Sequence, residues 1–472
     1  MLNLIQKLKP FIILSLIISI LTLSSISVIC ENDDSESSTK AEDTKKLEED
    51  KPKQRGIGEK PTLGSGETGI LIDQTGGNIL LDYDSDKRMF PASTTKIMTA
   101  LLIFEAISDG KISNDTQVEI KKEMIDGLPI DGTSMDLKEG EIVTIDALLK
   151  GMLIASGNDA ASALAYSIDN NYNGFIDNMN KRATELGCTD THFVNSHGLH
   201  DDNHYTTAKD MAKIARAAMK HYGFRNIVDC AHIKIAPTNL SNERYYISTN
   251  GLLSTMRYSN LLYKEATGIK TGHTLNAGNC LVASAKKNGI DLIAVVYGAK
   301  TAELSHKGCT EMFKYAFETH SSVSVLAKGA IACDIKVKQG KNSDKVALMT
   351  EEALNAVVPN GTSESQIELI PNIPKSVTAP IHIGDGIGTV SIVYNGVELY
   401  SCKLLASADV DRSFFWPILA ICDFIWENTV TRIILIIVLI FIGFFILAFI
   451  YKLYQNIKAE QRRRKRMQKK SR

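Results

Sequence analysis

The chain has 472 residues, of which 44% are hydrophobic and 23% are charged, so it is long enough for two ordinary domains with cores of their own. Its formal net charge is −1, which gives no support to nucleic acid as a partner. The eight cysteines are scattered without Cys-x-x-Cys pairs, so the sequence implies no zinc site and assigns no disulfide.

The first sixty residues indicate export and a tether. Lys7 and Lys9 precede an apolar run from Phe11 to Val28, which is typical of a signal peptide over residues 1–30. The run is also long enough to remain as an uncleaved N-terminal anchor, and both interpretations stay open. Residues 31–60 are rich in Glu, Asp, Lys and Ser and hold almost no large apolar side chain, so we expect a disordered charged linker.

Two apolar runs, 69–73 and 79–83, flank a Gly-rich turn and predict a β-hairpin. The hairpin leads into Pro91-Ala-Ser-Thr-Thr-Lys96, which begins an apolar helix that we expect to end near Gly110. Because residues three apart share a helical face, Lys96 can reach the hydroxyl of Ser93. A serine hydroxyl is a weak nucleophile, and an amine that is held neutral can serve as its base. The helix N-terminus would also favour an oxyanion beside Ser93.

The Ser-x-x-Lys spacing alone carries little information. It recurs at Ser37/Lys40 and Ser284/Lys287, and a helix-capping serine beside a surface lysine is the ordinary interpretation. What matters is that two further motifs follow it at domain-scale separations.

The second motif is Ser156-Gly-Asn158, in a loop after a helical pattern over 143–155, and by itself it would be an ordinary turn. The third motif is Lys270-Thr271-Gly272, in a predicted edge strand that precedes two β-like runs, 280–284 and 291–297. In this order the three motifs are the signature of penicillin-binding proteins and β-lactamases.

Three histidines, His192, His197 and His204, cluster around a loop that precedes an amphipathic helix. Thr207 and Asp210 have the spacing of a capping box at the start of that helix. Metal ligation is one interpretation of the histidines. Without a carboxylate or cysteine partner at fixed helical spacing, loop packing and hydrogen bonding are favoured.

After about residue 320 short β-like runs alternate with Gly, Asn and Pro turns, which predicts a small all-β domain over 321–410. The runs are 331–337, 345–349, 366–370, 388–394 and 397–404. Residues 411–430 contain several aromatic side chains and are expected to form an interfacial segment at the membrane surface.

Residues 433–451 are apolar without a charge and long enough to cross a bilayer core of roughly 30 Å, so they predict a transmembrane helix. A buried core helix is the alternative. The basic tail, 452–472, is expected on the cytoplasmic side, which places the bulk of the chain outside. Directly after a membrane span, anionic membrane lipids are a better partner for this tail than nucleic acid.

The motifs and their flanks resemble the low-molecular-mass penicillin-binding proteins, the serine-type D-alanyl-D-alanine carboxypeptidases. The resemblance covers roughly residues 61–410 and rests on Pro91–Lys96, Ser156–Asn158, Tyr205-Thr-Thr-Ala-Lys-Asp210 and Gly268-Ile-Lys-Thr-Gly-His-Thr274. It implies an α/β (α+β) catalytic domain of the β-lactamase/transpeptidase type over 61–320, with an antiparallel sheet flanked by helices.

The resemblance also implies a role for each motif residue. The nucleophile would be Ser93, its general base Lys96, and the proton relay to the leaving D-alanine Ser156. Asn158 would hold the substrate amide, while Lys270 and Thr271 would receive the terminal carboxylate. Lys270 would also help to keep Lys96 neutral. Gly272 would leave room for substrate, and the backbone N–H groups of Ser93 and His273 would form the oxyanion hole. Peptidoglycan stem peptides are the implied substrates, β-lactams would acylate Ser93, and no cofactor or metal is needed.

One position departs from the family. Many relatives carry a carboxylate-binding arginine a little beyond the strand that follows Lys-Thr-Gly, and the stretch Lys300–Lys307 has none. Either Lys300, His306 or Lys307 substitutes for it, or the affinity for carboxylate is weaker.

The sequence disfavours two of three alternative functions. A class A β-lactamase would carry Ser-Asp-Asn and a Glu-x-x-Leu-Asn loop, and the sequence has Ser-Gly-Asn and no such pattern between residues 159 and 268. An endopeptidase that cuts cross-links would use the same site, and the sequence does not separate it. A catalytically silent wall-binding scaffold is disfavoured, because all three motifs keep their chemical groups.

Overall fold

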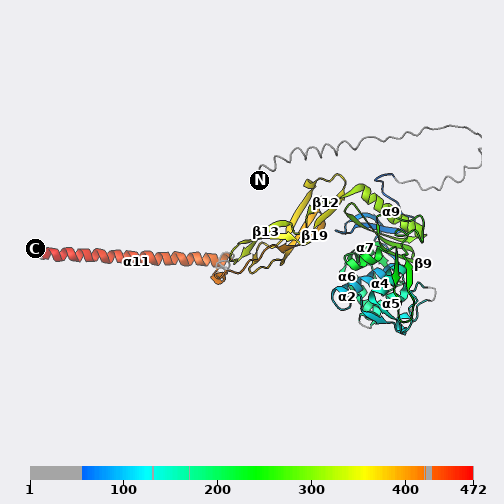
Figure 1. Cartoon of the computed structure of the whole chain (residues 1–472). Coiled ribbons are helices and arrows are strands. Elements are labelled where there is room, and N and C mark those ends of the chain that lie inside the picture. Colours follow the sequence, from blue (N-terminus) through cyan, green and yellow to red (C-terminus); the bar gives the residue numbers. More distant parts are fainter. Residues whose placement is uncertain (1–55, 130–131, 169–170, 419, 421–427, 471–472) are drawn as a thin grey trace, which may run out of the picture. The chain divides into compact units, whose positions relative to one another are not determined.

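The computed structural model describes residues 56–129, 132–168, 171–418, 420 and 428–470 (Figure 1). The expected signal peptide or anchor, nearly all of the expected linker, and residues 419 and 421–427 of the expected interfacial segment lie outside the described residues.

A five-stranded sheet with the order β2-β1-β11-β10-β9 organises the first large part of the described chain, and every pairing in it is antiparallel. Its strands are β1 (Thr68–Asp73), β2 (Ile79–Tyr83), β9 (Ala266–Thr274), β10 (Gly278–Lys287) and β11 (Ile290–Ala299). The predicted hairpin is confirmed, and so is the edge position of the strand that carries the Lys-Thr-Gly motif.

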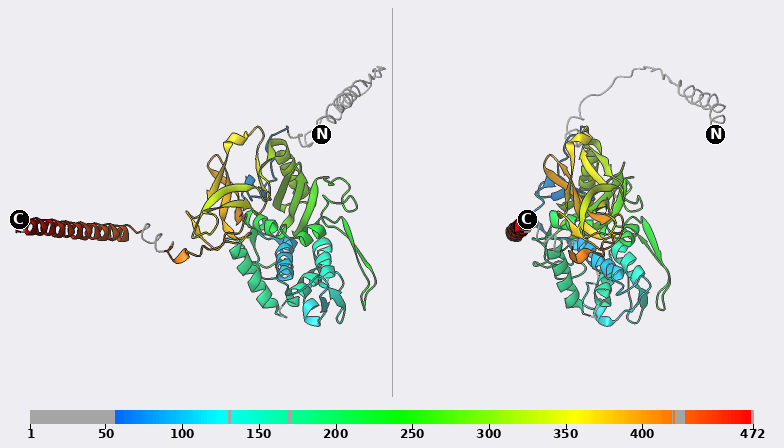
Figure 2. Two further views of the ribbon diagram at one scale, coloured as in Figure 1. Left: turned by 60° about the vertical axis from the view of Figure 1, so that its left-hand side comes forward. Right: turned by 90° about the vertical axis from the view of Figure 1, so that its left-hand side faces the viewer.

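Helices cover both faces of this sheet (Figures 1 and 2). Strand β11 shows why, because its residues alternate between two cores. Ile293, Val295 and Tyr297 belong to the core shared with α2 (Lys96–Ser108) and α7 (Ala208–Ala218). Leu292, Ala294 and Val296 belong to a second core, beneath α9 (Ala302–Thr319). The antiparallel sheet flanked by helices is therefore as expected.

The remaining elements of this part of the chain are helical segments and short paired strands. The helical elements are η1 (Ala92–Thr95), α3 (Lys122–Ile125), α4 (Ile145–Lys150), the π-helical turn η2 (Gly151–Ala155), α5 (Asn158–Ser167), α6 (Tyr172–Glu185) and α8 (Tyr222–Val228). The short strands form the pairs β3 (Arg88–Met89) with β6 (Thr206–Thr207), β4 (Gln117–Glu119) with β5 (Ile142–Thr144), and β7 (His232–Ile235) with β8 (Arg244–Ile247).

Two local predictions need correction. The helical pattern over 143–155 begins in strand β5, because Val143 is paired with Val118, and the helix itself starts at Ile145 after the Thr144 cap. The capping box at α7 is only half formed: the Thr207 hydroxyl accepts from the backbone N–H of Asp210, whereas the Asp210 carboxylate binds Asp190 N–H and Thr191.

The second large part is all β, as predicted. A six-stranded sheet has the order β16-β18-β19-β14-β13-β17, and β12 pairs with β15 beside it. The strands are β12 (His320–Leu326), β13 (Ile331–Lys338), β14 (Lys345–Thr350), β15 (Leu354–Pro359), β16 (Ile367–Asn372), β17 (Val377–Thr378), β18 (Gly386–Tyr394) and β19 (Val397–Ala406), with the 3₁₀ turn η3 (Glu364–Gln366). The sequence prediction missed β12, β15 and β17; β12 follows α9 with no turn residue between them.

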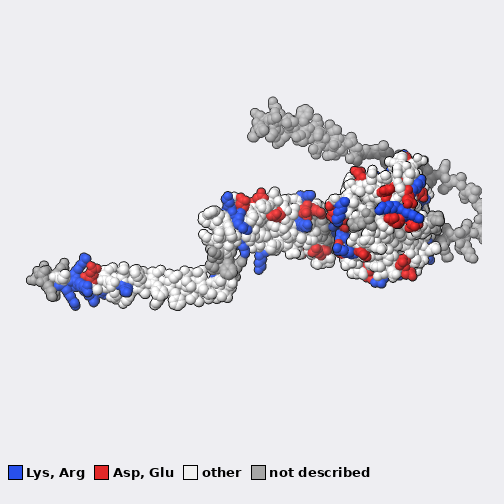
Figure 3. Space-filling model, turned by 90° about the horizontal axis from the view of Figure 1, so that it is seen from below, with Lys and Arg blue, Asp and Glu red and all other residues white. Residues whose placement is uncertain are grey.

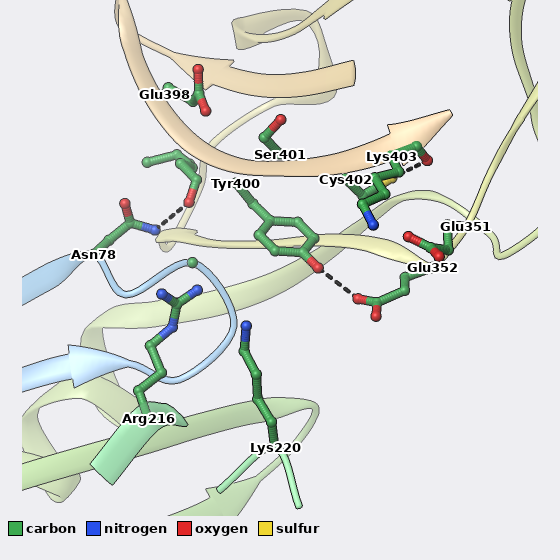
Figure 4. Close-up of a pocket in the computed structure, with 12 residues that line it drawn as sticks. Asn78, Arg216, Lys220, Glu351, Glu352, Glu398, Tyr400, Ser401, Cys402 and Lys403 are labelled. Atoms are coloured by element: carbon green, nitrogen blue, oxygen red, sulfur yellow. Dashed lines mark hydrogen bonds between the residues drawn. The ribbon is translucent and has the colours of Figure 1, made fainter. Parts of the chain in front are cut away.

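The turn between β1 and β2 contacts the all-β part. The side-chain amide of Asn78 donates to the carbonyl of Leu399 at 2.8 Å, and Arg216 of α7 holds the same turn through the carbonyls of Gln74 and Thr75. A pocket of about 370 Å³ lies here, with Tyr400 donating to Glu352 on its far wall (Figure 4).

The C-terminal helix α11 (Thr429–Lys470) contains the predicted apolar span. None of its most apolar stretch is buried against the described chain, so the buried core helix is wrong for this segment, and its length and composition fit a membrane span. Figure 3 shows an uncharged length of this helix followed by a cluster of basic side chains near its end.

Candidate active site

The first motif lies on a 3₁₀ turn, η1, that leads directly into α2, rather than inside the α-helix itself. Lys96 Nζ is 3.0 Å from Ser93 Oγ, so the predicted pair is formed. Thr94 links the turn to the sheet. Its hydroxyl donates to Pro91 O at 2.7 Å and lies 2.8 Å from the hydroxyl of Tyr297 on β11. The sheet thus fixes the position of the serine.

The amine of Lys96 is fully buried and has three oxygen neighbours. Besides Ser93 Oγ, it contacts Asn158 Oδ1 at 2.7 Å and the carbonyl of His197 at 2.6 Å. Burial lowers the pKa of Lys96 well below its ordinary value, and the nearby charge of Lys270 lowers it further. The two carbonyl oxygens can only accept, so they take both N–H bonds of a neutral amine. Its lone pair is then left for the serine hydroxyl.

The second motif faces the same cleft. Ser156 ends the η2 turn in the left-handed conformation (φ 66°), and Asn158 begins α5. The next residue, Asp159, is buried, and its carboxylate accepts from the backbone N–H groups of Met135 and Leu137. This anchors the loop that supplies Gly132 and Thr133 to the cleft wall.

The third motif lies on the edge strand β9. Lys270 is buried, and its Nζ donates to Thr271 O at 3.1 Å; burial and, secondarily, Arg257 lower the pKa of Lys270 to about 7. The hydroxyl of Thr271 donates to the hydroxyl of Thr249 at 2.6 Å.

Gly272 has a packing role that the sequence did not reveal. A Cβ on this residue would lie 2.9 Å from Pro91 O and 3.0 Å from Ser93 N. The glycine therefore lets β9 approach the turn that carries the nucleophile, in addition to leaving space in the cleft.

These elements enclose a cleft of about 360 Å³. The predicted site residues that line it are Ser93, Ser156, Asn158, Thr271, Gly272 and His273. Lys96 and Lys270 are buried immediately behind it, so the structure brings all the predicted site residues together.

Comparison with known proteins agrees with this geometry. The family model described as D-alanyl-D-alanine carboxypeptidase matches residues 58–301, and the model described as the C-terminal domain of penicillin-binding protein 5 matches residues 320–412. The chain belongs to the D-alanyl-D-alanine carboxypeptidase family. The resemblance stated from the three motifs is confirmed.

Relatives in this family match most of the chain. The D-alanyl-D-alanine carboxypeptidase DacF of Bacillus subtilis is 32% identical over 349 residues, which are 74% of this chain and 87% of that protein. DacC of Escherichia coli is 32% identical over 354 residues, which are 74% of this chain and 84% of DacC. The crystal structure of penicillin-binding protein 5 from Haemophilus influenzae superposes with a TM-score of 0.60 at 29% identity, over 75% of this chain and 99% of the other.

The sequence indicated a loop around the histidines but did not reveal that this loop packs against the turn that carries Ser93. Gly198 (φ 85°) packs directly on Ala92 O, and Thr99 Oγ1 donates to Ser196 O at 2.6 Å. No spacing in the sequence connects this loop to the serine, because the contact is made between segments about a hundred residues apart.

The three histidines make hydrogen bonds within this region, as favoured. His204 Nε2 is 2.7 Å from Thr95 Oγ1, and His192 Nδ1 is 2.7 Å from Asn203 O. His197 Nδ1 accepts from the backbone N–H of Leu199 at 3.2 Å. Burial lowers the pKa of both His197 and His204 to about 3, so they are neutral around pH 7.

Proposed function

We propose that the chain removes the terminal D-alanine from peptidoglycan stem pentapeptides through an acyl-enzyme on Ser93. The observation that carries this proposal is the setting of Lys96 Nζ, held by two carbonyl oxygens and 3.0 Å from the serine hydroxyl. A base in this position can take the serine proton as the hydroxyl attacks.

In the acylation step Ser93 Oγ forms a bond to the carbonyl carbon of the penultimate D-alanine, and its proton passes to Lys96. The negative charge develops on the carbonyl oxygen, which the N–H groups of Ser93 and His273 would stabilise. When the intermediate collapses, the C–N bond to the last D-alanine breaks. Ser156 would pass its proton to the departing nitrogen and take up the proton held by Lys96, which returns that amine to its neutral form. Asn158 would hold the substrate amide while its Oδ1 also holds Lys96.

Water completes the cycle by hydrolysing the ester on Ser93, which releases the shortened stem peptide. A β-lactam presents a similar acyl group and leaves a long-lived ester on the same atom. Within the described residues β9 is an edge strand, and no strand pairs with the backbone groups on its outer side, which suits an extended peptide lying along it.

We place the catalytic domain at 61–320 and the membrane-proximal β-rich domain at 321–410. Helix α11 would anchor both to the cell membrane, with 452–472 as the cytoplasmic tail, because the basic residues follow the apolar span and favour the inner side. The tail would contact anionic lipid headgroups.

The test uses the full-length protein in detergent. It is incubated with benzylpenicillin and its mass is measured beside a Ser93→Ala control. A stable single adduct on Ser93, with D-alanine released from a pentapeptide, supports the proposal. Rapid turnover of penicillin without an adduct would indicate a β-lactamase. Folded protein that forms no adduct and releases no D-alanine would leave a wall-binding scaffold.

A further inference from the structure

A carboxypeptidase accepts a peptide whose end carries a free carboxylate, and a carboxylate that enters a partly closed cleft needs a cationic or multiply donating partner. Lys270 alone is a weak source of positive charge, because burial lowers its pKa to about 7. The sequence suggested Lys300, His306 or Lys307 for this task.

The structure disfavours those three residues. The ring of His306 is buried with both nitrogens engaged: Nε2 accepts from Gly251 N–H at 3.0 Å and Nδ1 donates to Ala302 O at 2.6 Å. Burial also lowers the pKa of His306, so it is uncharged around pH 7. Lys300 and Lys307 are exposed and are not among the residues that line the cleft.

Arg257 occupies the right place. It lies in the loop between β8 and β9. Its side chain is exposed like those of the two lysines, but unlike them it lines the same cleft as Thr249, Thr271 and Ser93. A guanidinium stays charged at all physiological pH values and matches a carboxylate with two parallel N–H donors. In the described part of the chain no hydrogen bond or ion pair occupies Arg257, so its donors are available to a ligand.

The loop that carries Arg257 is held at its base. A Cβ at Gly251 would lie 2.8 Å from the ring of Tyr258, and the rings of Tyr258 and His306 are 5.8 Å apart. His306 of α9 thus fastens both the start of the loop, through Gly251 N–H, and the residue that follows Arg257. It acts as a positioning residue for the arginine rather than as a ligand.

We propose that Arg257, supplied from the loop before β9, binds the terminal carboxylate of the substrate in place of an arginine after β11. The inference rests on the proposed carboxypeptidase function. The substrate's last residue would then lie between Arg257 and the paired hydroxyls of Thr249 and Thr271, with its scissile bond over Ser93.

The experiment compares two peptides that differ only at the end: one ends in D-Ala-D-Ala with a free carboxylate, the other in the same dipeptide as a C-terminal carboxamide. Release of the last residue is measured with full-length wild type and with Arg257→Gln, Arg257→Lys and Lys307→Gln. We expect Arg257→Gln to lower kcat/KM for the carboxylate peptide by roughly 10- to 100-fold, as for lost hydrogen bonds between charged groups. The carboxamide peptide should change little.

Arg257→Lys should retain part of the preference for the carboxylate, and Lys307→Gln, which alters an exposed cation outside the cleft, should match wild type. Equal losses on both peptides would show a structural role and overturn the proposal, as would an unchanged rate on the carboxylate peptide. If the chain is not a carboxypeptidase, wild type will release D-alanine no faster than Ser93→Ala. That result would overturn both the proposed function and the proposed role of Arg257, and it differs from the results that overturn the role of Arg257 alone.

Discussion

Gly198 offers the sharpest test of how the loop behind the active site positions the nucleophile. A Cβ at this residue would lie 1.8 Å from Ala92 O and 2.9 Å from Thr95 Oγ1, and contacts below 3.0 Å are not tolerated against backbone. Ala92 directly precedes Ser93, so in Gly198→Ala the turn η1 and the loop at residue 198 must separate by more than an ångström, and we expect part of this movement to displace the serine. A misplacement of about 1 Å can cost on the order of 10²-fold in rate.

Gly187 provides a matched control. It has a similar backbone conformation, φ 73° against 85° for Gly198, but a Cβ there meets nothing within 4 Å. Gly187→Ala should therefore show only the strain of a left-handed alanine, roughly 1–2 kcal/mol, which is a few degrees in melting temperature.

The assay is the second-order rate constant for acylation of Ser93 by a fluorescent penicillin, measured beside thermal unfolding. Gly198→Ala should acylate on the order of 10²-fold more slowly than wild type and melt below Gly187→Ala, whose acylation should be unchanged. If both variants acylate at the wild-type rate, the loop does not position the serine and the reasoning is refuted.

Four further outcomes are expected. Lys96→Ala should slow acylation by roughly 10²- to 10⁴-fold, as for loss of a general base. Lys287→Ala, which alters another Ser-x-x-Lys spacing of the described chain, should leave acylation unchanged, and equal effects of the two variants would contradict the assignment. The pKa of Lys270 is lowered from 10.5 to about 7 in the folded chain, so between these pH values the unfolded chain binds more protons than the folded one. The free energy of unfolding should therefore rise with pH across this window. The urea midpoint should rise less between pH 7 and pH 9 in Lys270→Met than in wild type, and an equal rise would contradict the assignment. Asp159→Ala should lower the free energy of unfolding by about 1–3 kcal/mol and slow acylation, because the loop over 132–137 loses its hydrogen bonds to the carboxylate. Unchanged stability and acylation would show that the loop keeps its position without Asp159. Removal of 429–472 should move the protein out of the membrane fraction with acylation retained, and continued membrane binding would point to another anchor.

Local patterns were enough to predict much of the fold. The alternation in β1 and β2 with a Gly-rich turn, the apolar helix after Ser93, and the β-like runs beyond residue 320 were all recognisable, because each reflects a periodicity that the backbone imposes within a few residues. The secondary-structure prediction failed where pairing with a distant segment competed with the local periodicity. Residues 142–144 form a strand because Val143 pairs with Val118, although the pattern from residue 143 onward is helical.

Two of the Ser-x-x-Lys spacings within the described chain, Ser93/Lys96 and Ser284/Lys287, show the same limit at the level of chemistry. Ser93 and Lys96 lie on a helical turn and meet at 3.0 Å. Ser284 and Lys287 lie on strand β10, where residues three apart point to opposite faces, and Ser284 bonds to Thr267 instead. Spacing has chemical meaning only once the secondary structure is known.

The three motifs, their order and the family to which the chain belongs follow from the sequence alone, because these are properties of short contiguous segments. The surroundings of the motifs are defined only in the folded chain. The tertiary structure sets the two carbonyl oxygens around Lys96, the approach of β9 to the serine through Gly272, the support from Gly198, and the presence of Arg257 in the cleft. These contacts join segments separated by tens to hundreds of residues. The pKa of a buried amine depends on that assembled surrounding rather than on its neighbours in the chain.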